Sequence, residues 1–120
     1  MLKVLFGSKD KELILQYILS KNEGYASKIA RFYNMNSSQI LKQLENLENG
    51  GVLVGIQVGR ARLYKFNPRY YFLEELKNLL KKAREVYPDE FKEKLLFNRT
   101  TPRRKNKPYV LKGTEDETEI

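Results

Sequence analysis

Five polar residues near the middle of the chain have side chains that can hydrogen-bond to nucleic acid. They are Ser37, Ser38, Gln39, Lys42 and Gln43. Glutamine can pair with the edge of adenine, and lysine can contact guanine or phosphate. Serines near the start of a helix suit phosphate, because free backbone N–H groups and the helix dipole favour an anion there. The solvated face of an ordinary helix is the alternative explanation of the same pattern.

Four basic residues lie on either side of this stretch. Arg60 and Arg62 fall in a short segment between two β-rich runs, where they could contact the DNA backbone or the minor groove. A solubilising pair at a hairpin turn would have the same sequence. Lys28 and Arg31 precede the stretch and could contact phosphate. All nine residues are therefore candidates for DNA binding.

The elements that must position these side chains are two short helices joined by a tight turn. Apolar residues at helical spacing predict a first helix over residues 27–33. Asn34 suits the left-handed conformation that the turn requires, and Asn36 suits the N-cap of a second helix. That helix is predicted to continue to about Asn49. Its buried side is expected to carry Ile40, Leu44 and Leu47.

A hairpin follows the helical pair. Two β-rich runs, residues 52–58 and 63–66, predict antiparallel strands around a loop of residues 59–62. On the other side of the pair, Ser8 suits the N-cap of a helix that ends near Ser20. The order is therefore helix, helical pair and hairpin, with further helical sequence after them.

This order resembles the winged helix-turn-helix regulators of the ArsR/MarR type, in their small prokaryotic and archaeal form. The segment YASKIARFYNMNSSQILKQLENLENGGVLV is similar to the family signature, in which the recognition helix ends in Leu-Glu-x-x-Gly and an apolar residue. VGRARLYKFNP resembles the wing and its closing strand. The resemblance implies an α+β, mostly α fold: a three-helix core plus a β-hairpin wing, followed by a C-terminal helix.

The same resemblance implies a function. It predicts a sequence-specific, double-stranded DNA-binding transcriptional regulator, with the recognition helix in the major groove and the Arg-bearing wing on the backbone or minor groove. One departure is Leu41, which stands where family members often carry a small polar residue. Another is the lack of Cys and His, so a metal-responsive mechanism does not carry over.

The helical sequence after the hairpin predicts a dimer contact. Apolar residues recur every three or four positions over residues 71–87, and Pro88 separates this helix from a shorter one that ends near Phe97. The apolar stripe is wider than one small domain needs, which favours a homodimer. The residues predicted to form the contact are Phe72, Leu73, Leu76, Leu79, Leu80 and Ala83.

Three segments follow from these patterns. Residues 1–68 are predicted to be the DNA-binding domain, and residues 69–98 the helices that dimerise. Residues 99–120 are polar and charged in blocks, with six basic residues up to residue 113 and four acidic ones after it, which predicts a disordered tail. The basic block could be a second DNA-binding arm or a solvated tail.

Composition limits the classes of function. The net charge of +8 over 120 residues favours a nucleic-acid partner over a membrane surface. The absence of His removes the usual general base near neutral pH, and the lack of Cys removes thiolate metal ligands. We therefore expect no enzyme activity, no metal and no cofactor. With no signal peptide or transmembrane stretch recognised in the sequence, a cytoplasmic location and no membrane partner are expected.

Two alternatives belong to other classes. The winged helix could be a protein-interaction module in a larger complex, and Leu41 is the residue that favours this. The chain could also be a non-catalytic accessory protein or an antitoxin, which binds a protein partner through its C-terminal tail, here residues 88–120, and DNA through its wing domain.

Overall fold

The computed structural model describes residues 1–96, so the predicted tail lies outside the described part of the chain. The elements in chain order are α1 (Lys3–Phe6), α2 (Lys9–Lys21), β1 (Gly24–Tyr25), α3 (Ala26–Tyr33), α4 (Ser37–Asn49), β2 (Leu53–Val58), β3 (Ala61–Phe66), α5 (Leu73–Arg84) and α6 (Asp89–Leu96). None of these helices is both long enough and apolar enough to cross a membrane.

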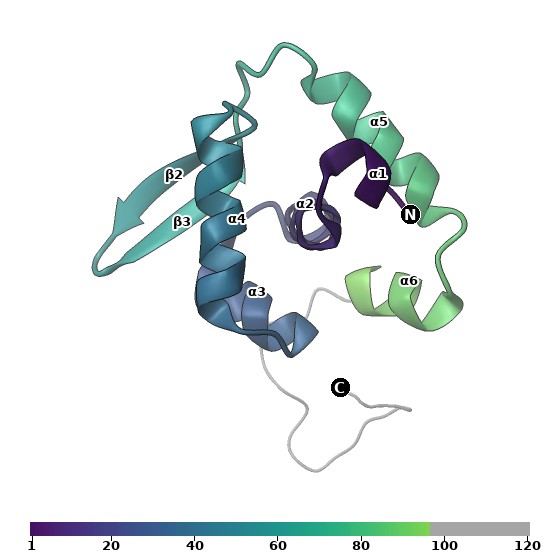
Figure 1. Ribbon diagram of the computed structural model, residues 1–120, viewed down its shortest axis with the longest axis horizontal. Helices are drawn as coiled ribbons and strands as arrows, with labels where there is room; N and C mark the ends of the chain where they lie inside the picture. Colours follow the sequence, from purple (N-terminus) through teal and green to yellow (C-terminus); the bar gives the residue numbers. More distant parts are fainter. Residues whose placement is uncertain (97–120) are drawn as a thin grey trace.

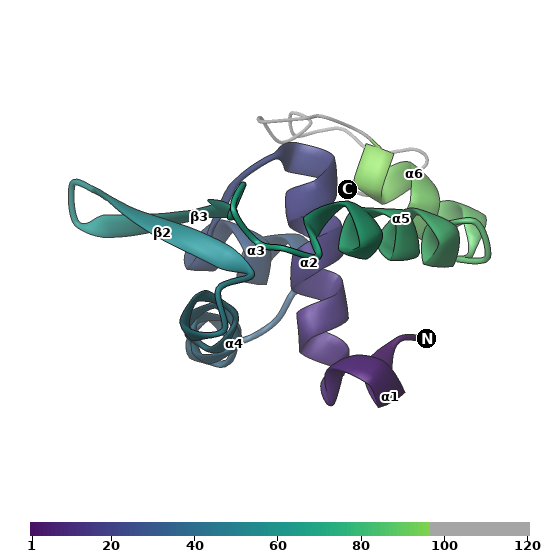
Figure 2. The same cartoon turned by 90° about the horizontal axis from the view of Figure 1, so that it is seen from above.

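Helix α2 occupies the middle of the molecule. Figure 1 views it nearly along its axis, with α3 and α4 on one side and α5 and α6 on the other. Figure 2 shows the same helix from the side. Ile14, Leu15 and Ile18 are buried because neighbours cover the helix on most sides. Ser8 caps its first turn, as predicted, by accepting a hydrogen bond from the amide of Lys11.

Helices α3 and α4 form the predicted helical pair. Asn34 adopts the left-handed conformation, with φ of 56°, and the amide of Met35 donates to the carbonyl of Ala30 at 2.8 Å. Asn36 caps α4 by accepting a hydrogen bond from the amide of Ser38 at 2.8 Å. The expected roles of Asn34 and Asn36 are confirmed, and together they fix where α3 ends and α4 begins.

The three strands form one antiparallel sheet in the order β1–β3–β2. Leu53 and Tyr64 are buried on the face toward the helices. The hairpin of β2 and β3 extends beyond α4 as a wing (Figures 1 and 2). The fold is therefore a winged helix-turn-helix, α+β and mostly α, with a three-helix core and further helices after the wing. This confirms the predicted fold class.

The loop at the tip of the wing is shorter than predicted. Val58 pairs with Ala61, so the loop contains only Gly59 and Arg60. Gly59 has φ of +61°, a conformation that glycine adopts without strain. The prediction of a loop over residues 59–62 was wrong, because Ala61 and Arg62 both belong to β3. Arg62 therefore lies along the side of the wing and not at its tip.

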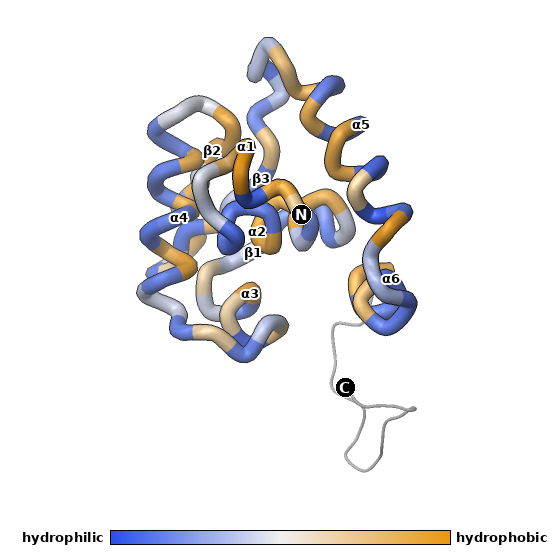
Figure 3. Tube along the Cα trace, turned by 45° about the vertical axis from the view of Figure 1, so that its right-hand side comes forward, coloured by the Kyte–Doolittle hydropathy of each residue, from blue (hydrophilic) through white to orange (hydrophobic). Residues whose placement is uncertain are grey.

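The helices after the wing differ from the prediction in extent and in burial. α5 covers less than the predicted residues 71–87, and α1 was not predicted. Figure 3 shows hydrophobic positions alternating with hydrophilic ones along α5. Leu80 and Ala83 lie in the core of the protomer, so these two cannot also contact a second chain in this conformation. The sequence pattern could not separate core positions from positions open to a partner.

Two polar residues of α2, one turn apart, are buried in the core. Glu12 accepts hydrogen bonds from the amide of Leu2 at 2.7 Å and from the Tyr87 hydroxyl. Burial alone would raise the pKa of Glu12, but the hydrogen bonds from Tyr87 and Leu2 outweigh it and lower the pKa. The stability that ionised Glu12 supplies is therefore present above its ordinary pKa, and is lost as the pH falls through the lowered pKa of the folded state.

Gln16 continues this network. Its Nε2 donates to the carbonyl of Leu80 at 2.8 Å and to the Tyr87 hydroxyl at 3.2 Å. Its Oε1 accepts from Nη2 of Arg84 at 2.7 Å, and the same Arg84 nitrogen donates to the hydroxyl of Ser20 at 2.8 Å. The polar network therefore joins α2 to α5 and to the turn after α5.

Replacing Arg84 tests this network. In Arg84→Met, the buried oxygen of Gln16 is left without its donor, so we expect the free energy of unfolding to fall by about 1–3 kcal/mol. Arg69→Met is the matched control, because Arg69 is exposed and should change stability by no more than about 0.5 kcal/mol. Urea unfolding followed by circular dichroism measures both. Equal stability of the two variants would contradict a structural role for the network.

Candidate nucleic-acid interface

The side of α4 toward the wing borders an open groove of about 510 Å³. The first residues of α3 and α4 reach this groove through Ser27, Ser37 and Ser38. From the wing, Arg60 and Arg62 line it. The structure thus brings together the two serines and the two wing arginines that the sequence singled out. In Figure 2, α4 is viewed nearly end-on, beside the hairpin.

Three other predicted residues are exposed but do not line the groove. Lys42 is exposed on α4, on the side opposite the buried Ile40 and Leu44. Lys28 and Arg31 are exposed on α3. The three cations make no ion pair within residues 1–96, so all are available to an anionic partner.

The two predicted glutamines face elsewhere. The Nε2 of Gln39 donates to the carboxylate of Asp10 at the start of α2, at 2.7 Å. Gln43 is half-buried one turn further along the same side of α4. Neither glutamine lines the groove, whereas Leu41 and Glu45 do. Sequence reasoning missed Glu45, although its position one turn after Leu41 on the exposed side of an amphipathic helix was a usable signal.

Arg62 crosses from the wing to α4. Its Nη2 and Nε lie 2.5 Å and 3.3 Å from the two carboxylate oxygens of Glu48. The guanidinium passes so closely over Gly55 that a Cβ at this position would clash with Nε of Arg62. Glycine at this point of β2 therefore leaves the space through which Arg62 reaches Glu48. The ion pair ties the wing to the last third of α4.

This pair changes the titration of nearby groups. The hydrogen bond from Arg62 lowers the pKa of Glu48, and the same bond raises the pKa of Arg62. Burial raises the pKa of Tyr64, and the charge of Glu48 adds to this effect. The hydroxyl of Tyr64 is buried at the groove, beside the pair of Arg62 and Glu48. It therefore stays protonated at neutral pH.

The opposite face of the wing carries an apolar patch toward its tip. Ile56 pairs with Leu63, and Val58 pairs with Ala61, so these side chains share the face that points away from the helices. Ile56 and Val58 are 45% and 47% exposed. Exposed apolar residues grouped in this way are typical of a surface that contacts another macromolecule.

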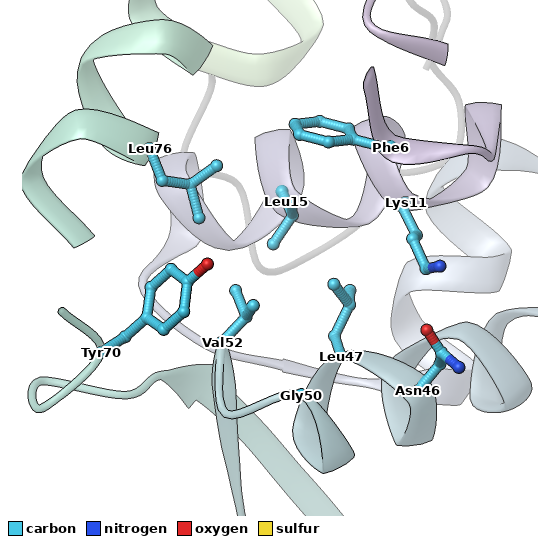
Figure 4. Close-up of a pocket in the computed structure, with 9 residues that line it drawn as sticks. All are labelled: Phe6, Lys11, Leu15, Asn46, Leu47, Gly50, Val52, Tyr70 and Leu76. Carbon is cyan, nitrogen blue, oxygen red and sulfur yellow. The ribbon is translucent and has the colours of Figure 1, made fainter. Parts of the chain in front are cut away.

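A second, smaller pocket of about 240 Å³ lies where α1, α2 and α5 approach the end of α4. Figure 4 shows Phe6, Leu15, Val52 and Leu76 around it, with Lys11 among the polar residues at its edge. It is a gap between packed elements, distant from the wing tip. Among residues 1–96, no group of three or more His, Cys, Asp or Glu side chains could hold a metal ion.

Comparison with known protein families and with curated proteins finds no match to this sequence. Among solved structures, the adhesin competence repressor AdcR from Streptococcus pyogenes is similar, with 13% identity, a TM-score of 0.46 and coverage of 76% of this chain and 80% of that one. A mutant of ZitR from Lactococcus lactis in its apo form has 14% identity, a TM-score of 0.46 and coverage of 77% and 78%. At these values neither similarity bears on what this chain binds.

The pair of Arg62 and Glu48 can be tested in solution. We expect an NMR titration to give Glu48 a pKa below that of an ordinary glutamate, because the guanidinium stabilises the carboxylate. In Arg62→Gln the pKa of Glu48 should rise back toward the ordinary range. Arg60→Gln is the matched control and should leave it unchanged. A Glu48 that titrates alike in all three proteins would mean that the pair does not form.

Proposed function

We propose that this protein is a sequence-specific, double-stranded DNA-binding transcriptional regulator. Helix α4 enters the major groove, and the wing contacts the neighbouring backbone or the minor groove. One observation carries the proposal: the exposed side of α4 and the Arg60 tip of the wing border the same groove. The role is binding rather than catalysis, and a regulator of this kind acts in the cytoplasm.

The distribution of charge supports this proposal. Lys42 projects from α4, Arg60 from the wing and Lys28 from α3, and all three are exposed on elements that border the groove. The net charge of the whole chain is +8. Cations grouped in this way displace the counterions of DNA, which supplies affinity that does not depend on sequence.

The two wing arginines have different roles in this proposal. Arg60 has no ion pair within residues 1–96 and can bind phosphate directly. Arg62 is already paired with Glu48, so it orients the wing and adds little net charge to the surface. The sequence alone had assigned both arginines to DNA contact.

Salt dependence tests the DNA contacts. We expect Arg60→Ala and Lys42→Ala each to weaken binding to every duplex. Each should also flatten the slope of log affinity against log salt by about 0.9 for every phosphate that the side chain neutralises. Lys81→Ala on α5 is the matched control, since it removes the same charge away from the groove. Fluorescence anisotropy with labelled duplexes gives both quantities.

Two results would contradict the proposal. If the wild-type protein showed no salt-dependent binding to any duplex, DNA would not be its partner. If Lys81→Ala flattened the slope as much as Arg60→Ala, the binding would reflect overall charge and not this groove.

We also infer that the protein acts as a homodimer. Phe72 and Tyr71, at the start of α5, are 55% and 87% exposed, and their rings contact each other edge to face with centroids 5.0 Å apart. Exposed paired aromatics suit the centre of a protein interface. Leu73, Leu76 and Leu79 are half-buried beside them and would form the rest of the contact.

The charge variant Phe72→Glu tests the dimer. Because Phe72 is exposed in the protomer, we expect a folded monomer where the wild type is dimeric, measured by sedimentation velocity. Val86→Glu is the control, since Val86 is exposed but lies outside the predicted contact. A monomeric wild type at micromolar concentration would rule the dimer out.

A second candidate function rests on the apolar face of the wing. The exposed Ile56 and Val58 would suit a protein partner better than DNA. In this function the winged helix serves as a protein-interaction module. The accessory or antitoxin version places its partner on residues 88–120, of which the structure describes residues 88–96. If a polar substitution of Ile56 abolished binding of a protein partner and left DNA binding unchanged, the interaction-module function would be favoured.

A further inference from the structure

Two exposed side chains lie on the groove side of α4. Leu41 is 37% exposed, although it is a large apolar residue. Glu45 is exposed one turn later and makes no hydrogen bond or ion pair within the described residues. Both line the groove. Their neighbour Glu48, by contrast, is neutralised by Arg62.

Other polar residues of α4 are already engaged. The hydroxyl of Ser38 donates to Oδ1 of Asn36 at 2.5 Å, within the cap of the helix. Gln39 is held by Asp10 of α2. Among the side chains of α4 that line the groove, Leu41 and Glu45 are therefore the ones that make no hydrogen bond within residues 1–96 and are long enough to reach a base edge.

The chemical groups in the major groove of DNA limit which bases Leu41 and Glu45 can contact. A lone carboxylate beside phosphates is repelled unless a donor compensates it, and the base donor that suits Glu is the N4 amino group of cytosine. An apolar side chain can gain contact in the groove from the 5-methyl group of thymine. Both residues therefore favour pyrimidines.

We infer that Leu41 and Glu45 are the base-reading side chains of α4. Glu45 accepts a hydrogen bond from the N4 amino group of a cytosine, and Leu41 contacts the methyl group of a thymine. Four residues span about 6 Å along a helix, so the two bases lie within about two base pairs of each other at about 3.4 Å per pair. The inference rests on the proposed DNA-binding function and specifies its sequence preference.

Selection of bound duplexes from a random library tests the role of Glu45. We expect the wild-type motif to contain a cytosine whose preference changes to adenine in Glu45→Gln, because glutamine pairs with adenine. Gln39→Ala is the matched control and should keep the wild-type motif. Circular dichroism confirms that each variant is folded, which the exposure of Glu45 and Gln39 favours.

Base analogues test the role of Leu41. Replacing the motif's thymine by deoxyuridine removes only the methyl group, and should weaken wild-type binding about fourfold. Leu41→Ala should bind the two duplexes with equal affinity. Anisotropy at one salt concentration measures both ratios.

The outcomes separate this inference from the proposed function. Duplex binding without a shared motif would overturn the inference and leave non-specific DNA binding intact. A motif that Glu45→Gln does not alter, or a wild type indifferent to the thymine methyl group, would overturn it as well. No binding to any duplex would remove the proposed function itself.

Discussion

Burial of two polar side chains of α2 is the constraint on which the arrangement of the helices depends. Glu12 and Gln16 are 4% and 0% exposed, and a buried polar group without partners is strongly destabilising. The N-terminal amine and the amide of Leu2 supply two partners of Glu12, and the other partners come from the segment after the wing: Arg84, Tyr87 and the carbonyl of Leu80. The segment after the wing must therefore pack on α2 so that the buried polar groups of Glu12 and Gln16 have hydrogen-bond partners.

The same helix determines the position of the groove. One side of α2 carries the polar network, and the hydroxyl of Tyr33 at the end of α3 donates to the carbonyl of Leu13 on α2 at 2.7 Å. Asn34 then sets the direction in which α4 leaves α3. The contacts of α3 and α4 with α2 therefore set where the exposed side of α4 lies. The pair of Arg62 and Glu48 adds a tie from the wing to α4.

Local sequence was sufficient to predict most elements of the fold, although not α1. Asn34 and Asn36 act through their own backbone neighbours, and Leu44 follows a helical period, so short windows contain the needed information. Pairings over long distances in the chain were not predictable in this way. Gln39 was assigned to DNA because Asp10, 29 residues earlier, gave no sign of being its partner. Arg62 was placed in a loop because the strand register that puts it in β3 is a tertiary property.

The face that we propose binds DNA carries both positive and negative side chains. Arg60 and Lys42 supply positive charge, whereas Glu45 is a free carboxylate on the same surface. On non-specific DNA this carboxylate opposes binding, and on a matched site it would be compensated by a base amino group. In this proposal the cations supply affinity for any DNA, and the middle of α4 discriminates between DNA sequences.

Amide NMR during titration with a selected duplex tests the central claim most directly. If α4 and the wing bind DNA, the largest shift changes will fall on residues 37–45 and on Arg60 and Arg62 of the wing, whereas Ile56 and α6 will change little. Changes confined to the rear of the wing or to α5 and α6, with residues 37–45 unaffected, would contradict the account.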